Sequence, residues 1–77
     1  MREVIVYSRQ GCHLCEVMLA AAEPLCRGRA LLVVRDVDTR PEWQEAFGLD
    51  VPVLEIDGRE ICRHRLDEAA LAAALAG

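Results

Sequence analysis

The chain has 77 residues, a net charge of -4 and 53% hydrophobic residues, and these values exclude several classes of protein. Its length suits one small domain, so we expect a single domain over residues 1–77. The apolar content is sufficient for a folded core and excludes a disordered segment. The acidic balance, with no basic face in the sequence, argues against a general nucleic-acid-binding protein.

The sequence contains no run long and apolar enough to cross a membrane. The apolar stretch after Met1 is also too short for the core of a secretory signal peptide. We therefore expect a cytoplasmic protein that binds no membrane. Structural disulfides are reduced in the cytosol, so two structural bridges among the four cysteines are the less favoured interpretation.

Cys12 and Cys15 form a Cys-x-x-Cys pair between an apolar run and a helical pattern. This position puts Cys12 at the N-terminus of a helix, where free N–H groups and the helix dipole favour a thiolate over a thiol. Cys15 lies one helical turn further on and can reach back to the same sulfur. An activated thiolate with a second thiol one turn away is the minimum apparatus for dithiol–disulfide exchange.

The first elements follow from hydrophobic periodicity. Residues 4–7 predict a central strand buried on both faces, and residues 8–11 predict a turn. A helix is expected from residue 13 to about residue 23, with Pro24 ending or kinking it and Gly28 providing a left-handed exit. Cys26 is expected to be a buried, inert thiol. The expected apolar face of this helix consists of Leu14, Val17, Met18, Ala21 and Leu25.

Residues 31–37 predict a second buried strand, parallel to the first because a helix connects the two. A short helix then follows, with a capping box between Thr39 and Glu42, Pro41 in its first turn and Gly48 at its end. Trp43 and Phe47 are expected to pack against the sheet. The alternative for Trp43 is a partly exposed position near the thiols.

Residues 51–56 predict a strand entered through a proline, and Asp57 with Gly58 predicts a two-residue hairpin turn. Residues 60–62 return as an edge strand. Asp67 is expected to cap the final helix, with Leu66 and Leu71 as a hydrophobic staple. The predicted order is βαβαββα, an α/β fold with a mixed four-stranded sheet.

This order and two motifs resemble the glutaredoxin-like proteins, the smallest form of the thioredoxin fold, over essentially the whole chain. The motifs are Tyr7-Ser8-Arg9-x-Gly11-Cys12-x-x-Cys15 and Val51-Pro52-Val53-x-x-Ile56-Asp57-Gly58. The resemblance implies that Cys12 is the nucleophile and Cys15 the resolving thiol. It also implies that Pro52 is a cis-proline lying against the dithiol and that the Val51 backbone pairs with the incoming substrate. Arg9 keeps the positive charge that the family often supplies with Lys.

The residues between the cysteines depart from the family, which usually has Pro-Tyr where this chain has His13-Leu14. A protonated His13 would stabilise the Cys12 thiolate and make the disulfide more oxidising. The alternative is a solvent-exposed histidine with a modest local effect.

The region that matches the glutathione-binding turn of glutaredoxins differs more from the family. Glutaredoxins hold glutathione partly through a Gly-Gly turn followed by an acidic residue at the start of the last helix. Cys62 and Arg63 replace the two glycines here, while Asp67 stands for the acidic residue. We expect this bulk to make glutathione a poor reductant. The charges of Arg63 and Arg65 favour the opposite expectation, since the two side chains offer partners for the two carboxylates of glutathione.

We therefore expect a monomeric thiol–disulfide oxidoreductase that reduces protein or small-molecule disulfides and is re-reduced by a reductase or a thiol donor. No bound cofactor or metal is expected. Three alternatives remain: a redox-inert interaction module, a carrier of a shared iron–sulfur cluster, and a zinc site. The zinc ligands would be Cys12, Cys15, Cys62 and His64, which the expected fold keeps apart.

Overall fold

The computed structural model describes all 77 residues. Four strands form one mixed sheet in the order β2-β1-β3-β4, with β1 and β2 parallel and the other pairs antiparallel. This arrangement confirms the predicted α/β fold and the order βαβαββα. No helix is long and apolar enough to cross a membrane. The elements are β1 (Arg2–Ser8), α1 (His13–Cys26), β2 (Ala30–Asp36), the 3-10 helix η1 (Val37–Thr39), α2 (Pro41–Phe47), β3 (Val53–Ile56), β4 (Arg59–Arg63) and α3 (Glu68–Ala76).

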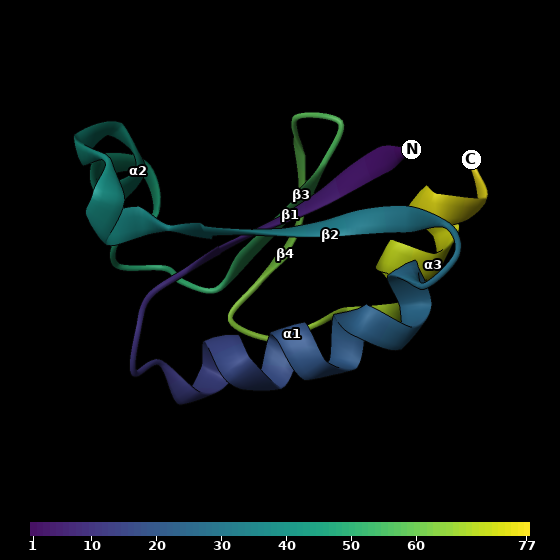
Figure 1. Cartoon of the computed structure of the whole chain (residues 1–77), viewed down its shortest axis with the longest axis horizontal. Coiled ribbons are helices and arrows are strands. Elements are labelled where there is room, and N and C mark those ends of the chain that lie inside the picture. The colour runs from purple at the N-terminus through teal and green to yellow at the C-terminus, as the bar shows by residue number, and fades with distance from the viewer.

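The helices lie on both sides of the sheet, with α1 and α3 on one side and α2 at one end of the other (Figure 1). Each side has its own core. The smaller core lies under α2, where the Tyr7 ring stacks on Phe47 with centroids 4.1 Å apart and meets Trp43 edge-on at 5.8 Å. This contact confirms that both α2 aromatics pack against the sheet. The larger core, under α1 and α3, contains Val4, Val6, Met18, Ala22, Cys26, Ala30, Leu54, Ile56 and Leu71.

Helix α1 is longer than predicted and presents a different face. It continues through Pro24 to Cys26, because the apolar residues of its last turn are buried against the core. Leu14 and Val17 are about half exposed, at 48% and 50%, so the predicted apolar face was wrong at these two positions. The face that meets the sheet is formed instead by Cys15, Met18, Ala22 and Cys26.

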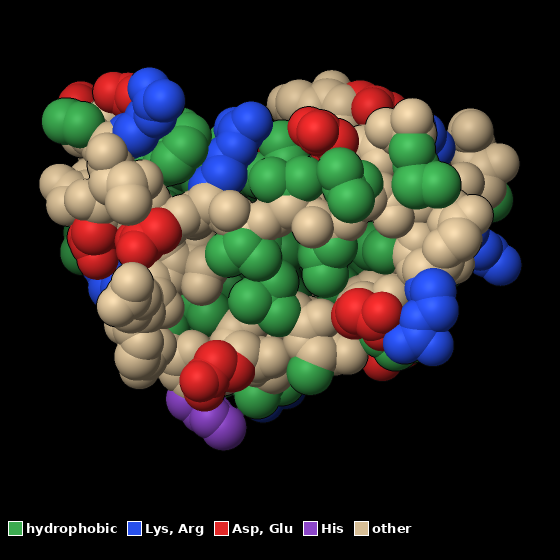
Figure 2. All heavy atoms as spheres, in the orientation of Figure 1, with side chains coloured by type: hydrophobic (Ala, Val, Ile, Leu, Met, Phe, Trp, Pro, Cys, Tyr) green, Lys and Arg blue, Asp and Glu red, His purple; other side chains and the backbone are tan.

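Strand β2 is an edge strand, not the fully buried strand predicted for residues 31–37. It pairs only with β1, and Leu31 and Val34 are each 53% exposed. Strand β2 crosses the front of the molecule in Figure 1. Figure 2 has the same orientation and shows hydrophobic side chains gathered in the middle of this face. Continuous hydrophobicity predicted a strand correctly but did not distinguish an edge from the centre of the sheet.

The start of α2 also differs from prediction. Arg40 occupies the N-cap position and its side chain caps nothing, so the Thr39–Glu42 capping box was wrong. The Thr39 hydroxyl instead donates to the Asp36 carbonyl at 2.6 Å, within the turn of η1. Pro41 opens the helix and Gly48 follows its last residue, as predicted.

The C-terminal half follows the sequence closely. Asp57 and Gly58 both have positive φ, at 54° and 76°, as a two-residue hairpin turn requires. The Asp67 carboxylate accepts a hydrogen bond from the Ala70 N–H at 3.0 Å, which confirms the predicted cap. The N- and C-termini lie at the same end of the molecule, where the Arg2 guanidinium donates to the Ala74 carbonyl at 2.9 Å, and α1 begins at the opposite end (Figure 1).

Candidate active site

Cys12 and Cys15 form a disulfide, with their Cα atoms 5.2 Å apart. Cys12 is partly exposed, whereas Cys15 is 1% exposed. Cys12 is the N-cap residue of α1, and its Sγ accepts a hydrogen bond from the Cys15 N–H at 3.2 Å. An N–H group aimed at Sγ favours the thiolate once the disulfide is reduced. The sulfur accessible to solvent is therefore also the one held by the helix N-terminus.

The turn before Cys12 depends on Gly11 and Arg9. Gly11 has a φ of +76°, which side-chain-bearing residues rarely adopt. The Cys12 N–H donates to the Arg9 carbonyl at 3.3 Å and closes this turn. The turn places Cys12 directly beyond the end of the central strand β1.

Val51 and Pro52 lie next to this turn through the sheet register. The Val51–Pro52 peptide bond is cis, as the resemblance implied. Tyr7 pairs with Val53, so extending the antiparallel register by one residue sets Pro52 opposite Ser8. Pro52 is buried, and no backbone hydrogen bond holds the N–H or the C=O of Val51. Val51 thus offers a free donor and a free acceptor beside the end of β1.

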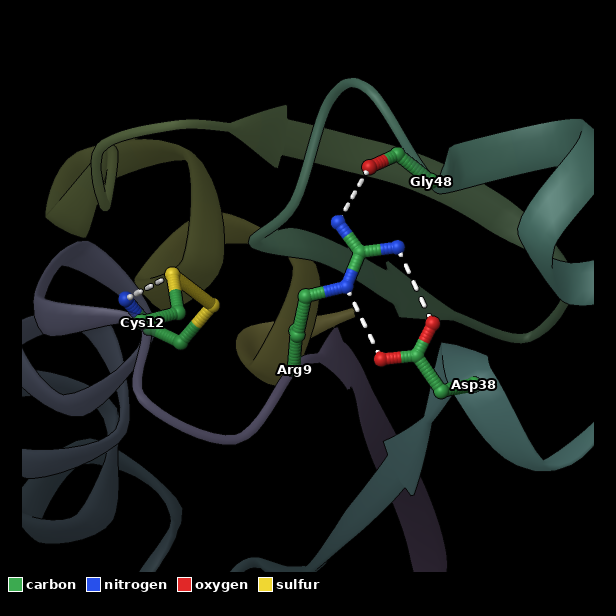
Figure 3. The surroundings of a disulfide bond; sticks show 5 residues. Arg9, Cys12, Asp38 and Gly48 are labelled. Atoms are coloured by element: carbon green, nitrogen blue, oxygen red, sulfur yellow. Dashed lines mark hydrogen bonds and ion pairs between the residues drawn. A yellow bond between two sulfur atoms is a disulfide. The ribbon is translucent and has the colours of Figure 1, made fainter.

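Each of the three nitrogens of the Arg9 side chain donates a hydrogen bond within the protein. Its Nε and Nη2 donate to the two carboxylate oxygens of Asp38, at 2.9 and 3.1 Å, and its Nη1 donates to the Gly48 carbonyl at 2.8 Å. Figure 3 shows the guanidinium facing these two partners, and no interaction joins it to the sulfurs. Its charge is matched by Asp38, whose pKa is lowered chiefly by the hydrogen bond from Arg9.

Asp50 anchors residues 48–52, which we call the proline loop, from the other side. Its carboxylate lies 3.1 Å from Arg63 Nη1 and 3.6 Å from His64 Nε2. The Pro52 carbonyl accepts the N–H of His64 at 2.7 Å. His64 has a φ of +67°, so the glycine-like backbone after β4 is carried by a histidine. The proline loop is thus tied to the end of β4 at two points.

His13 and Asp67 complete the residues predicted for the site. His13 is exposed at the first position of α1, with no hydrogen bond or ion pair to its ring. Asp67 is exposed and uses one carboxylate oxygen to cap α3. The cap leaves the second oxygen free, so a role for Asp67 in ligand binding stays a prediction.

The other two thiols lie on the α1 side of the sheet. Cys26 is 2% exposed, and burial, followed by the Glu23 charge, raises the pKa of its thiol. Burial also raises the pKa of Cys62, with charges on Asp67 and Glu60 adding to it and the Asp67 backbone N–H opposing it. Both cysteines are unpaired. No three His, Cys, Asp or Glu side chains converge into a metal-binding group, so the four residues considered as zinc ligands do not meet.

A groove of about 310 Å³ lies between α1 and the segment that joins β4 to α3. Leu14, which lies between the two cysteines, contributes to its wall together with Val17, Met18, Ala21, His64, Arg65, Leu66 and Glu68. The half-exposed side chains of Leu14 and Val17 therefore form part of an open, mostly apolar surface on α1.

Sequence reasoning missed Asp38, Gly48 and Asp50, which connect the two halves of the site. Asp38 and Gly48 are 29 and 39 residues from Arg9 in the chain. Neither belongs to a local motif, and only the folded sheet brings them to Arg9. The one available signal was the pair of acidic residues at 36 and 38, placed after the strand parallel to β1.

Three features define a protein of the thioredoxin-like class. They are the sheet order β2-β1-β3-β4, the Cys-x-x-Cys disulfide at the start of the first helix, and the cis-proline before β3. The chain belongs to the glutaredoxin-like domain family (DUF836), whose model matches residues 3–76.

Two solved structures share the fold. The solution NMR structure of protein Ne2328 from Nitrosomonas europaea is 33% identical, with a TM-score of 0.82, and the match covers 95% of this chain and 89% of that chain. The X-ray structure of protein XcR50 from X. campestris is 32% identical, with a TM-score of 0.71 and 95% of each chain covered. No curated protein matches the chain significantly.

Proposed function

We propose that the protein is a dithiol–disulfide oxidoreductase that reduces disulfides with Cys12 and Cys15. The observation that carries this proposal is the disulfide at the start of α1, in which the accessible Cys12 Sγ accepts the Cys15 N–H. A site built to stabilise the thiolate of the exposed cysteine, with its partner buried behind it, has the asymmetry that exchange chemistry needs.

The reaction proceeds in two exchanges. The Cys12 thiolate attacks one sulfur of the substrate disulfide, which forms a mixed disulfide and releases the other substrate sulfur as a thiolate. The Cys15 thiol loses its proton and attacks Cys12 Sγ, which forms the Cys12–Cys15 disulfide and releases the second substrate thiolate. The two thiolates released take up protons. Two electrons pass from the protein to the substrate, so a thiol or dithiol donor must then reduce the protein again.

The surroundings of the sulfurs suit a peptide disulfide. Val51 offers an unpaired N–H and C=O to an extended segment, as β-strand addition requires. Exposed Leu14 and Val17 offer apolar contact on the first turns of α1, the helix that begins after Cys12. Protein disulfides are therefore the favoured substrates, with small-molecule disulfides as the second class.

Single-turnover reduction tests the proposal. Protein reduced beforehand and freed of reductant is mixed with a short peptide that contains one disulfide, and peptide thiols are counted. The wild-type protein should release two thiols per molecule, and Cys12→Ser should release none. Cys26→Ala is the matched control, because it removes a buried thiol and should react like wild type. Equal release by Cys12→Ser and wild type would refute the proposal.

A further inference from the structure

Arg9 touches both halves of the site. Its backbone carbonyl accepts the N–H of Cys12, and its Nη1 donates to the carbonyl of Gly48, three residues before Val51. Its two remaining bonds form a fork on Asp38 (Figure 3). One side chain therefore links the turn before Cys12 to the start of the proline loop and to η1.

The partners of Arg9 are themselves held in place. The Asp38 N–H donates to the Asp36 carboxylate at 2.9 Å, and the Gln44 amide donates to Asp38 Oδ1 at 3.1 Å. The Gly48 N–H donates to the Gln44 carbonyl at 2.9 Å. Gln44 thus supports both acceptors, and the guanidinium binds a preformed site rather than two mobile groups.

The stability of the fold alone gives no reason for this arrangement. The side chains of Arg9 and Asp38 are 38% and 44% exposed, and ion pairs at such positions add little to stability. Two parallel N–H···O bonds do, however, fix direction, because the planar guanidinium matches the carboxylate in one orientation only. Its engagement also leaves Arg9 little freedom to act as a mobile charge for the substrate.

We propose that Arg9 is a positioning residue, which holds the proline loop at a fixed place relative to Cys12 through its fork on Asp38 and its bond to Gly48. This inference rests on the proposed function. A peptide that pairs with the Val51 backbone must also present its disulfide to Cys12 Sγ. Both requirements are met together only if the distance between the loop and the sulfur is held, since small misplacements of reacting groups lower rates steeply.

The test compares two disulfides that differ in their need for the loop. In the proposal, the backbone of a peptide disulfide pairs with Val51. The aromatic disulfide reagent DTNB needs no such pairing and reacts with any accessible thiolate. Each takes two electrons from the Cys12–Cys15 dithiol of protein reduced beforehand. Arg9→Gln should lower the second-order rate constant for the peptide about tenfold and change that for DTNB less than about twofold. Asp38→Asn removes the acceptor carboxylate of the same fork and should change the two rates in the same way. Either variant can therefore test the proposal if the other does not fold.

Arg9→Lys separates geometry from charge. It keeps the positive charge but loses the fork, and should react with the peptide as slowly as Arg9→Gln. Arg27→Gln is the matched control, because it breaks an exposed ion pair with Glu23 far along α1 and should leave both rates unchanged. A wild-type rate for Arg9→Lys, or equal loss with both disulfides in Arg9→Gln, would overturn the positioning role. A wild-type protein that reduces neither disulfide would overturn the proposed function itself.

Discussion

The Arg63 guanidinium is held between two acidic groups, with Nη1 3.1 Å from the Asp50 carboxylate and Nε 2.8 Å from that of Glu60. Asp50 lies two residues before Pro52, so this contact bridges β4 and the proline loop. Arg63 also stands where the resemblance to glutaredoxins implies one of the two glycines of the glutathione-binding turn. Its charge is already neutralised, so the bulk of the side chain, rather than its attraction for carboxylates, should govern access of glutathione.

The double substitution Cys62→Gly and Arg63→Gly, at the two positions where glutaredoxins have glycine, should therefore improve glutathione as a reductant. Turnover coupled to glutathione reductase and NADPH should rise roughly tenfold over wild type, because the variant removes two side chains from the entry path. Arg59→Gly, on the same strand, is the control and should have no effect. Wild-type turnover equal to that of the double variant would refute the steric argument.

Cys15→Ser should trap a mixed disulfide. Cys15 is 1% exposed and, in the proposed reaction, releases the substrate from Cys12. Without it, Cys12 should still attack the substrate and then retain one half of it. Intact-mass analysis should show an adduct of one substrate half, and peptide mapping should locate it on Cys12. A substrate adduct on Cys15 in the Cys12→Ser variant would reverse the assigned roles.

Of Cys12, Cys62 and Cys26 in the reduced protein, Cys12 should be alkylated first and Cys26 last. The pKa values of Cys62 and Cys26 are raised chiefly by burial, which lowers their thiolate fraction at neutral pH. Cys12 is partly exposed at a helix N-terminus, and we expect its alkylation midpoint below the value of about 8.5 for a free thiol. Iodoacetamide labelling followed by peptide mapping over a pH series measures both expectations. Labelling of Cys62 as fast as Cys12 would contradict them.

Asp38→Asn should lower the stability of the protein slightly at neutral pH and not in acid. The pKa of Asp38 is lowered from its ordinary value of 3.8, chiefly by the hydrogen bond from Arg9. A lowered carboxyl pKa contributes stability above the ordinary value, and this contribution is lost as the pH falls through the lowered one. The difference in unfolding free energy between wild type and variant should therefore shrink below about pH 4. Urea unfolding at several pH values tests this, and a pH-independent difference would contradict it.

Leu71→Ala should be one of the costliest truncations in α3. Leu71 is completely buried in the larger core, so its removal leaves a cavity and should lower the free energy of unfolding by about 2–5 kcal/mol. Leu49→Ala makes the same chemical change at a side chain that is 98% exposed, and should change stability by less than about 0.5 kcal/mol. Similar losses in both variants would show that burial is not the cause.

The elements and their order were predictable because each has a local signal. The turn at Asp57 and Gly58, the cap at Asp67 and the cysteine pair all depend on neighbours within a few residues. The position of β2 at the edge was not predictable in this way, since Leu31 and Val34 have the composition of a buried strand although they are exposed. Strand order is set by pairing between distant segments, which hydrophobic pattern does not encode.

The residues of the candidate site also fall into those with a local sequence signal and those without one. Cys12, Cys15 and Pro52 were marked by motifs, and the structure has the predicted helix start and the cis peptide bond. Arg9 was expected from the resemblance to place a positive charge near the site, and its guanidinium bonds to Asp38 and Gly48. Only the three-dimensional arrangement identifies these partners.

The hydrogen bond between Arg2 and Ala74 has a practical consequence for handling the protein. It joins β1 to α3, and both chain ends lie at the end of the molecule opposite the start of α1 (Figure 1). A fluorescent protein, an affinity tag or a surface tether fused to either terminus will therefore leave Cys12 unobstructed. Joining the adjacent ends with a short flexible linker also makes circular permutants accessible, with new termini opened in the hairpin turn at Asp57 and Gly58.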